Sequence, residues 1–208
     1  MESPFTFELS QAAEADFPTE YGQFRIYGFE GRFRRRDSGQ LILEEAAVIT
    51  MGDLSGPPPL LRIHSQCLTG DVFHSLRCDC RAQLEIALEE VGREGRGLII
   101  YELQEGRGIG LMNKLRAYEL QDRGADTVEA NEQLGFESDL RNYRLPAAIL
   151  NHLGIASVKL LSNNPAKVRA VEDAGVVVAE RVPCIAVEHD SRRIYLETKR
   201  AKMGHLLG

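Results

Sequence analysis

The sequence predicts an α/β fold, in which a layered mixed sheet with flanking helices is preceded by a β-rich N-terminal part. Two observations carry this prediction. The first 60 or so residues contain strand-like apolar runs, whereas helical and strand patterns alternate from residue 81 onwards. A chain of 208 residues can form one large domain or two small ones. We expect a single domain over residues 1–208, with the β-rich part at about 1–65 and the α/β part at about 66–208.

Strands are expected in the N-terminal part. Residues 21–31 (YGQFRIYGFEG) alternate apolar and polar side chains, as a half-buried strand does, and residues 41–50 (LILEEAAVIT) resemble a second strand. An Asp-Ser-Gly sequence at 37–39 marks the turn between them. A Gly-Pro-Pro-Pro break then precedes another strand at residues 60–65 (LLRIHS), which leads into a cysteine-rich segment.

The pattern then changes to helices and strands in alternation. Residues 82–95 have apolar side chains at the spacing of one helix face, residues 97–101 (GLIIY) form a buried strand, and residues 111–124 form a helix that stops at Gly124. Tyr118 lies on the apolar stripe of this helix with leucines, which predicts core packing.

The same alternation continues to residue 182. Residues 145–154 are helical and residues 158–162 form a strand. The next helix, residues 165–175, has Asn164 as N-cap and a proline at its first position. Residues 176–182 form a last strand, and the short basic tail LETKRAKMGHLLG carries no clear element.

Three of the four cysteines lie in the segment HSQCLTGDVFHSLRCDC: Cys67, Cys78 and Cys80. The N-terminal sequence lacks the pattern of a secretory signal, and disulfides are rare without export. Three soft ligands leave the fourth position of a zinc tetrahedron open, which a catalytic zinc requires. The spacing equally allows a structural zinc that His64 or His74 completes, and buried thiols packing as small hydrophobes are a further alternative.

Composition excludes several functions. The net charge of −6 disfavours broad binding to nucleic acid, and no apolar run is long enough for a membrane helix. Hydrophobic residues make up 43%, enough for a core. Cysteine usage and the missing signal indicate the cytoplasm. Cys184, beside a proline in an apolar run, is interpreted as a core or surface thiol.

Two strand-to-helix turns are candidates for anion binding. QEGRGIGL (104–111) exposes backbone N–H groups at a helix start, and Arg107 can bind a phosphate through two hydrogen bonds. It matches neither a dinucleotide nor a Walker motif, so a simple tight turn explains it equally well. SNNPAK (162–167) offers the Ser162 hydroxyl and the Lys167 charge, although a solvated lysine is also possible. Both turns could face one crevice at the strand ends.

Residues 126–143 (DTVEANEQLGFESDLRNY) are polar, with few periodic apolar residues. Their acids and Arg141 could take part in chemistry, but composition favours a solvated surface loop.

Together, the motifs HSQCLTGD, SLRCDC, EGRGIGLMNKLRAY, TVEAN, LGFESDLRNY, LLSNNPAK and KMGHLL resemble GTP cyclohydrolase II. The resemblance is dense from about residue 60 to the C-terminus. It implies a zinc-dependent enzyme that opens the imidazole ring of GTP and releases formate and pyrophosphate. The product would be 2,5-diamino-6-hydroxy-4-(5-phosphoribosylamino)pyrimidine, formed in the first committed step of riboflavin synthesis.

The resemblance also implies roles for individual residues. One Zn²⁺ per subunit would be held by Cys67, Cys78 and Cys80, and Mg²⁺ would accompany the substrate phosphates. Tyr118 would assist ring opening, Asp139 would accept a proton, and Arg141 would act at the α-phosphate. GTP would be bound by Arg62, Ile63, His64, Ser65, Gln66, Gln83, Glu105, Gly106, Arg107, Thr127, Ser162 and Lys167. A homodimer is implied, with GTP as the small-molecule substrate.

Three positions depart from the family's usual pattern. Gln66 stands where Glu is usual, Arg81 replaces Gly, and Ser162 replaces Thr while keeping a hydroxyl. These departures leave open a diverged relative that acts on GTP with partial chemistry or in a secondary-metabolite pathway. A nucleotide-binding module with a structural zinc is the non-enzymatic alternative.

Overall fold

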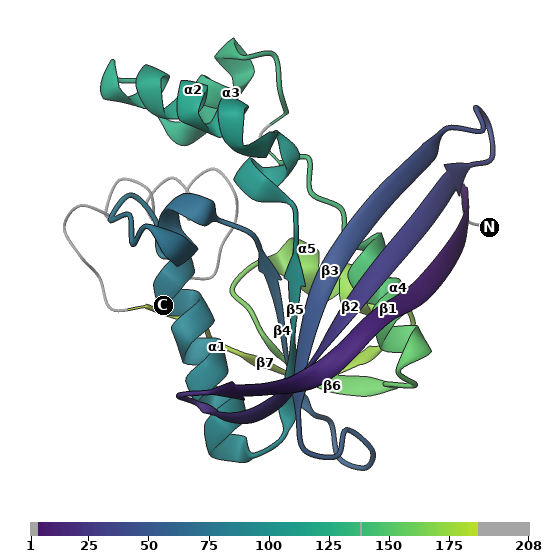
Figure 1. Ribbon diagram of the computed structural model, residues 1–208. Helices are drawn as coiled ribbons and strands as arrows, with labels where there is room; N and C mark the ends of the chain where they lie inside the picture. The colour runs from purple at the N-terminus through teal and green to yellow at the C-terminus, as the bar shows by residue number, and fades with distance from the viewer. Residues whose placement is uncertain (1–3, 138, 187–208) are drawn as a thin grey trace.

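The computed structural model describes residues 4–137 and 139–186, and its centre is one seven-stranded sheet (Figure 1). The strand order is β1-β2-β3-β5-β4-β6-β7. The strands are β1 (Phe5–Thr19), β2 (Gly22–Arg35), β3 (Leu41–Met51), β4 (Leu60–Ser65), β5 (Gly97–Glu102), β6 (Ser157–Leu161) and β7 (Val177–Val182). The sheet is continuous from the N-terminal part into the α/β part.

Five α-helices and two short turns connect these strands in the described chain. The helices are α1 (Cys80–Glu94), α2 (Gly110–Asp122), α3 (Thr127–Gln133), α4 (Arg144–His152) and α5 (Pro165–Asp173). The short turns are η1 (Leu68–Val72) and η2 (Glu105–Gly108).

The sheet is mixed, as predicted. Strands β1, β2, β3 and β5 pair antiparallel, whereas β5, β4, β6 and β7 pair parallel. The long strands β1–β3 end in an arm at the β2–β3 turn, which projects beyond the helices (Figure 1). Strand β1 was not predicted as a separate element. Most of its side chains are exposed, so it lacks the apolar alternation that identifies β2.

Side-chain alternation in the central strands divides the core into two. Leu61 and Ile63 of β4 point to one face, where α4 and α5 pack, while Leu60 points to the opposite face, against α1. Ile99 of β5 joins the α1 side and Ile100 the α4 side. Figure 1 shows the same division, with α1 on one side of the sheet and α4 and α5 on the other. Cys184 is buried in the core on the α1 side.

Two predictions for residues 111–143 were wrong. The stripe of α2 is not core, since Leu115 is 42% exposed and Ala117 alone is buried within this helix. The expected surface loop contains α3, whose N-terminus is closed by a reciprocal capping box between Asp126 and Glu129. The D-x-x-E spacing was the signal for this helix.

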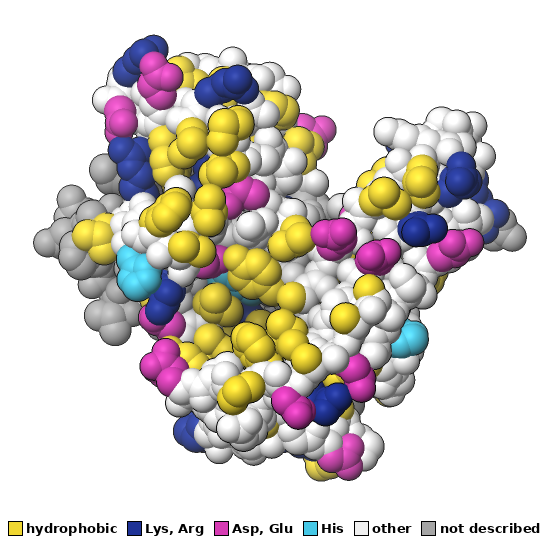
Figure 2. Space-filling view, in the orientation of Figure 1, with side chains coloured by type: hydrophobic (Ala, Val, Ile, Leu, Met, Phe, Trp, Pro, Cys, Tyr) yellow, Lys and Arg dark blue, Asp and Glu magenta, His cyan; other side chains and the backbone are white. Residues whose placement is uncertain are grey.

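Helices α2 and α3 form a lobe beyond the carboxyl ends of β4 and β5, and the outline is notched between this lobe and the tip of the β1–β3 arm (Figure 2). Within the described ranges, no helix has both the length and the hydrophobicity to cross a membrane. The basic tail and its KMGHLL motif lie outside the described residues.

Candidate active site

A pocket opens at the carboxyl edge of the parallel strands. Because β4, β5 and β6 are parallel, the segments that follow them emerge at one edge, where ligands of open α/β sheets bind. The predicted residues that line the pocket are Arg62, His64, Ser65, Gln66, Cys67, Cys78, Cys80, Gln83, Glu105, Gly106, Arg107, Tyr118, Thr127, Arg141, Ser162 and Lys167. The shared crevice expected for the two anion-binding turns is therefore present.

Three thiols form one end of the pocket. Cys67 follows β4, Cys78 lies in the next turn and Cys80 begins α1, and their sulfurs lie within 4.8 Å of one another. A side chain at Gly70 would collide with them, because its Cβ would lie 2.8 Å from Cys78 Sγ. The η1 turn can therefore approach the thiols only with glycine at this position.

Neither candidate histidine joins the thiols. His64 Nε2 lies 3.2 Å from the Asp71 carboxylate, which also accepts hydrogen bonds from the Cys67 N–H at 3.0 Å and the Tyr101 hydroxyl at 2.8 Å. His74 Nε2 lies 3.1 Å from Arg81 Nη1. Over the described ranges, the group of potential metal ligands contains the three cysteines alone. This favours the arrangement with an open fourth position.

The chemistry of the thiols fits a cation. Hydrogen bonds from Cys78 and Cys80 lower the pKa of Cys67, and the resulting thiolate raises the pKa of Cys78 to about 11 and that of Cys80 well above its usual value. One negative charge thus suppresses ionisation of the other two thiols. A divalent cation removes this conflict, and soft thiolates are ligands that Zn²⁺ prefers.

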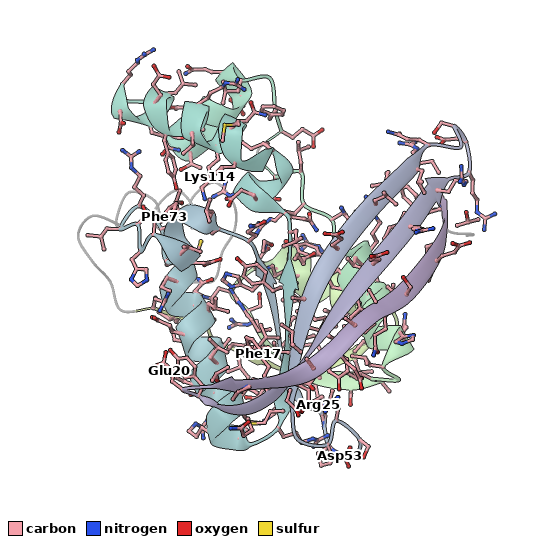
Figure 3. The ribbon with its side chains drawn as sticks, viewed as in Figure 1. Phe17, Glu20, Arg25, Asp53, Phe73 and Lys114 are labelled. Atoms are coloured by element: carbon pink, nitrogen blue, oxygen red, sulfur yellow. The ribbon has the colours of Figure 1, made fainter. Side chains whose placement is uncertain are left out.

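Lys114 connects the thiols to the glycine-rich turn, and sequence reasoning missed it. Its Nζ donates to Cys67 Sγ at 3.1 Å and to Glu105 Oε1 at 2.7 Å, while Glu105 Oε2 accepts from the Leu68 N–H at 2.7 Å. Figure 3 shows Lys114 on α2, above the turn that carries Phe73. The available signal was its i, i+4 spacing to Tyr118, which places both side chains on one helix face.

Tyr118 lies beside the thiols and not in the core. Its hydroxyl is 3.1 Å from Thr69 Oγ1, and the Arg77 guanidinium lies 4.8 Å from the ring centroid. Burial raises the pKa of Tyr118, so the phenol keeps its proton at neutral pH and can donate a hydrogen bond.

Buried cations line another part of the same pocket, which we call its basic end. Lys167 is 4% exposed and its Nζ donates to the Ile63 carbonyl at 2.6 Å. Arg62 donates to the Leu161 carbonyl at 2.9 Å and to Gln83 Oε1 at 2.7 Å. These contacts use carbonyl and amide oxygens, and they hold the two cationic side chains in fixed positions at the pocket. Such a site favours an anion.

The two strand-to-helix turns contribute differently. In η2, Gly106 and Arg107 both adopt left-handed backbone angles, with φ values of 62° and 61°. This is strained for arginine and typical of functional turns. After β6, the Ser162 hydroxyl accepts from the Asn164 N–H at 3.1 Å, and Asn164 caps α5 through the Ala166 N–H. The predicted N-cap is confirmed.

Arg141 reaches the pocket from the segment after α3. Its guanidinium forms two hydrogen bonds with Asp139, at 2.9 Å and 2.5 Å, and its side chain is 11% exposed. Burial alone would raise the pKa of Asp139, but the hydrogen bonds from Arg141 outweigh it and the pKa is lowered. Asp139 is therefore an ionised carboxylate at neutral pH.

Two predicted residues are absent from the pocket wall. The Ile63 side chain is buried in the core on the α4 side, and Asp139 contacts the site through Arg141. The pocket also contains residues that the sequence reading did not select: Arg77, Ile109, Lys114, Ala117, Gln121, Asn131, Asn163 and Asn164. For Asn131, the signal was its place in the TVEAN motif.

The residues that depart from the family pattern have defined surroundings. Arg81 Nε donates to Glu85 at 2.5 Å, and its Nη1 donates to the Asp71 carbonyl at 2.9 Å. The cation is therefore balanced by Glu85 and supports the η1 turn. Gln66 lines the pocket, and its backbone N–H donates to the Glu102 carbonyl at 2.8 Å.

Comparison with known proteins adds independent findings. The family GTP cyclohydrolase II matches residues 10–183. GTP cyclohydrolase-2 of Shewanella amazonensis is 51% identical over 200 residues, covering 96% of this chain and 94% of the relative. GTP cyclohydrolase-2 of Yersinia pseudotuberculosis is 52% identical over 201 residues, covering 96% and 98%. A solved two-domain 3,4-dihydroxy-2-butanone 4-phosphate synthase from A. baumannii matches with a TM-score of 0.41 and 18% identity, over 84% of this chain and 40% of that one.

Proposed function

The chain belongs to the GTP cyclohydrolase II family, and we propose from this premise that it hydrolyses GTP at the imidazole ring, releasing formate and pyrophosphate. The product is 2,5-diamino-6-hydroxy-4-(5-phosphoribosylamino)pyrimidine, the first committed intermediate of riboflavin synthesis. One observation carries the proposal: a single pocket is lined both by a cluster of three thiols and by buried cations. This polarity suits a nucleotide whose base and triphosphate need opposite chemistry.

The thiols would hold one zinc ion per subunit through Cys67, Cys78 and Cys80. Zinc bound there would supply Lewis-acid activation of water for attack on the guanine C8 position. Lys114 donates to the Cys67 sulfur and so offsets part of the negative charge of three thiolates. Mg²⁺ would accompany the triphosphate, because it binds mainly through substrate phosphates and needs few protein ligands.

Tyr118 would act at the ring-opening step as a hydrogen-bond donor. Its burial favours the protonated phenol, and Thr69 fixes the hydroxyl beside the thiols. A donor at this position stabilises negative charge that develops on the opening ring.

Arg141 would stabilise the phosphoryl group by its charge. A guanidinium paired with a carboxylate remains protonated and is a poor nucleophile, so electrostatic stabilisation is its most physical role at the α-phosphate. The same pairing keeps Asp139 ionised, which is the state that the proposed proton acceptor requires. The GTP-binding set would comprise Arg62 to Gln66, Gln83, Glu105 to Arg107, Thr127, Ser162 and Lys167, with Ile63 contributing its backbone.

We also propose a single-domain protomer, a homodimer and a cytoplasmic location. One continuous sheet supports the single domain. Exposed apolar side chains such as Phe73, 70% exposed, and Leu76, 49% exposed, support an interface between subunits. Free thiols at all four cysteines support a reducing compartment, and the net charge of −6 supports a partner other than nucleic acid.

The direct test is turnover of GTP by the purified protein with Mg²⁺ and measured zinc. We expect formate and pyrophosphate in equal amounts, and mass spectrometry should show a product without the formyl carbon. Unchanged GTP at full zinc content would refute the proposal. A product that keeps the formyl carbon would instead identify the diverged relative that Gln66 and Arg81 leave open.

A further inference from the structure

The segment that carries Arg141 is held by a side chain of the neighbouring strand end. Gln104, two residues after the end of β5, forms hydrogen bonds with both polar groups of the Asn142 backbone. Its Oε1 accepts from the Asn142 N–H at 3.0 Å, and its Nε2 donates to the Asn142 carbonyl at 2.6 Å. This two-point contact fixes the residue next to Arg141 in both position and orientation, as one rung of a sheet would.

Glu102 determines which way the Gln104 amide points. Glu102 is 1% exposed, and its Oε1 accepts a second hydrogen bond from Gln104 Nε2 at 2.8 Å. Both groups on the Nε2 side are acceptors, so the amide cannot turn over without losing them. The other carboxyl oxygen of Glu102 lies 3.3 Å from Ser65 Oγ, which links the end of β4 to the same network.

The remaining contacts of the segment act at other points. The Leu140 N–H donates to the Arg107 carbonyl at 3.0 Å, and the Asn142 side chain donates to Glu44 Oε1 at 3.0 Å. Gln104 therefore provides the backbone contact on the C-terminal side of Arg141, opposite the contact at Leu140. Its side chain does not line the pocket.

We propose that Gln104, oriented by Glu102, is a positioning residue that sets where the Arg141 guanidinium stands against the substrate phosphates. This inference rests on the proposed function of Arg141. Because its side chain does not line the pocket, Gln104 would act through the Asn142 peptide. Loss of this contact would let the segment move, and a misplacement of about 1 Å in a catalytic group costs about 100-fold in rate.

Gln104→Met tests this, because methionine keeps the length of the side chain and removes all three of its hydrogen bonds. We expect pyrophosphate release to fall about 100-fold in kcat with little change in KM for GTP. Gln23→Met on the exposed side of β2 is the matched control and should keep the wild-type rate. Gln104→Glu is the second variant: it keeps an acceptor for the Asn142 N–H but loses both donations, so it should also be slow.

A double-mutant cycle with Arg141→Ala separates positioning from general damage. If Gln104 acts through Arg141, Gln104→Met should cost little further activity once Arg141 is alanine. A full additional loss in that background, or wild-type rates in both Gln104 variants, would overturn the proposal.

Hydrogen exchange at the Asn142 amide, measured without GTP, provides a readout independent of turnover. It should accelerate in Gln104→Met and stay at the wild-type rate in Gln23→Met. Unchanged protection in Gln104→Met would also overturn the proposal. Turnover of GTP by the wild-type protein is measured separately and tests the proposed function. The hydrogen-exchange result does not depend on it.

Discussion

The thiol end and the basic end of the pocket differ in the charge that each is suited to bind. At the thiol end, three potential anions are packed within 4.8 Å and each hinders the ionisation of the next. At the basic end, Lys167 and Arg62 are already buried and hydrogen-bonded to neutral carbonyl and amide oxygens. The first end needs a cation to be complete, whereas the second is preorganised for an anion.

This difference has a structural cause. The thiols come from a turn and a helix start after β4, where Gly70 and the Asp71 carboxylate control the backbone. The cations are anchored to carbonyls of the parallel strands themselves, which are rigid. We therefore expect substitutions at the thiol end to change the zinc content of the protein. Substitutions at the basic end should instead change its affinity for GTP.

The largest effect should follow Cys80→Ser. Loss of one thiolate should reduce zinc content and lower the rate of formate release by at least about 1,000-fold, because the Lewis acid contributes several kcal/mol of transition-state stabilisation. Metal analysis and formate assays measure the two quantities. Cys184→Ser is the control, since this buried thiol lies outside the cluster and its variant should keep full zinc content. Full zinc in Cys80→Ser would contradict the assignment.

A smaller and different effect is expected from Lys167→Met at the basic end. The variant should keep its zinc and lose about 10- to 100-fold in kcat/KM for GTP, the size of one charge-assisted hydrogen bond. The unfolding free energy should be unchanged or higher, because a buried charge is replaced by an apolar chain of similar length. Steady-state kinetics and urea unfolding measure both. Loss of zinc in this variant would show that the two ends are not independent.

The smallest effect concerns Glu102, behind the basic end. Burial raises the pKa of Glu102 to about 7, above its ordinary value of 4.5. The folded state then binds more protons than the unfolded state between these two values, so this group's contribution to stability is lost as pH rises through that window. Glu102→Gln removes the dependence. Its stability relative to the wild type should rise by up to about 3 kcal/mol between pH 4.5 and 7.5.

Urea unfolding of the wild type and of Glu102→Gln at both pH values measures the difference between their free energies of unfolding. Effects that both proteins share, such as zinc loss at low pH, cancel in this difference. A pH-independent difference would show that Glu102 is not protonated in the folded protein near neutrality. Gln23→Met, which changes no charge, should show no such trend.

Much of the fold followed from local pattern. The strands at β2, β3, β4, β5, β6 and β7 and the helices α1, α2, α4 and α5 were predicted, because alternation and capping depend on neighbouring residues. Strand β1 was not predicted because its side chains are mostly exposed and therefore show no apolar alternation. Helix α3 was not predicted because its residues are mostly polar, although the spacing of Asp126 and Glu129 indicates its capping box.

The sequence by itself determined the chemistry that this chain carries: three clustered thiols, two anion-binding turns and the family motifs. Local spacing could not decide between an open and a closed metal site, nor place Tyr118, which sits on an apparent core stripe. Those decisions depended on tertiary structure. His64 forms a hydrogen bond with Asp71, so it is not a fourth ligand. The apolar stripe of α2 stays partly exposed, and Lys114 donates a hydrogen bond to Cys67, 47 positions away in the sequence. Contacts between segments so far apart in the sequence form only when the parallel strands bring their carboxyl ends to one edge of the sheet. A local sequence pattern does not predict such contacts.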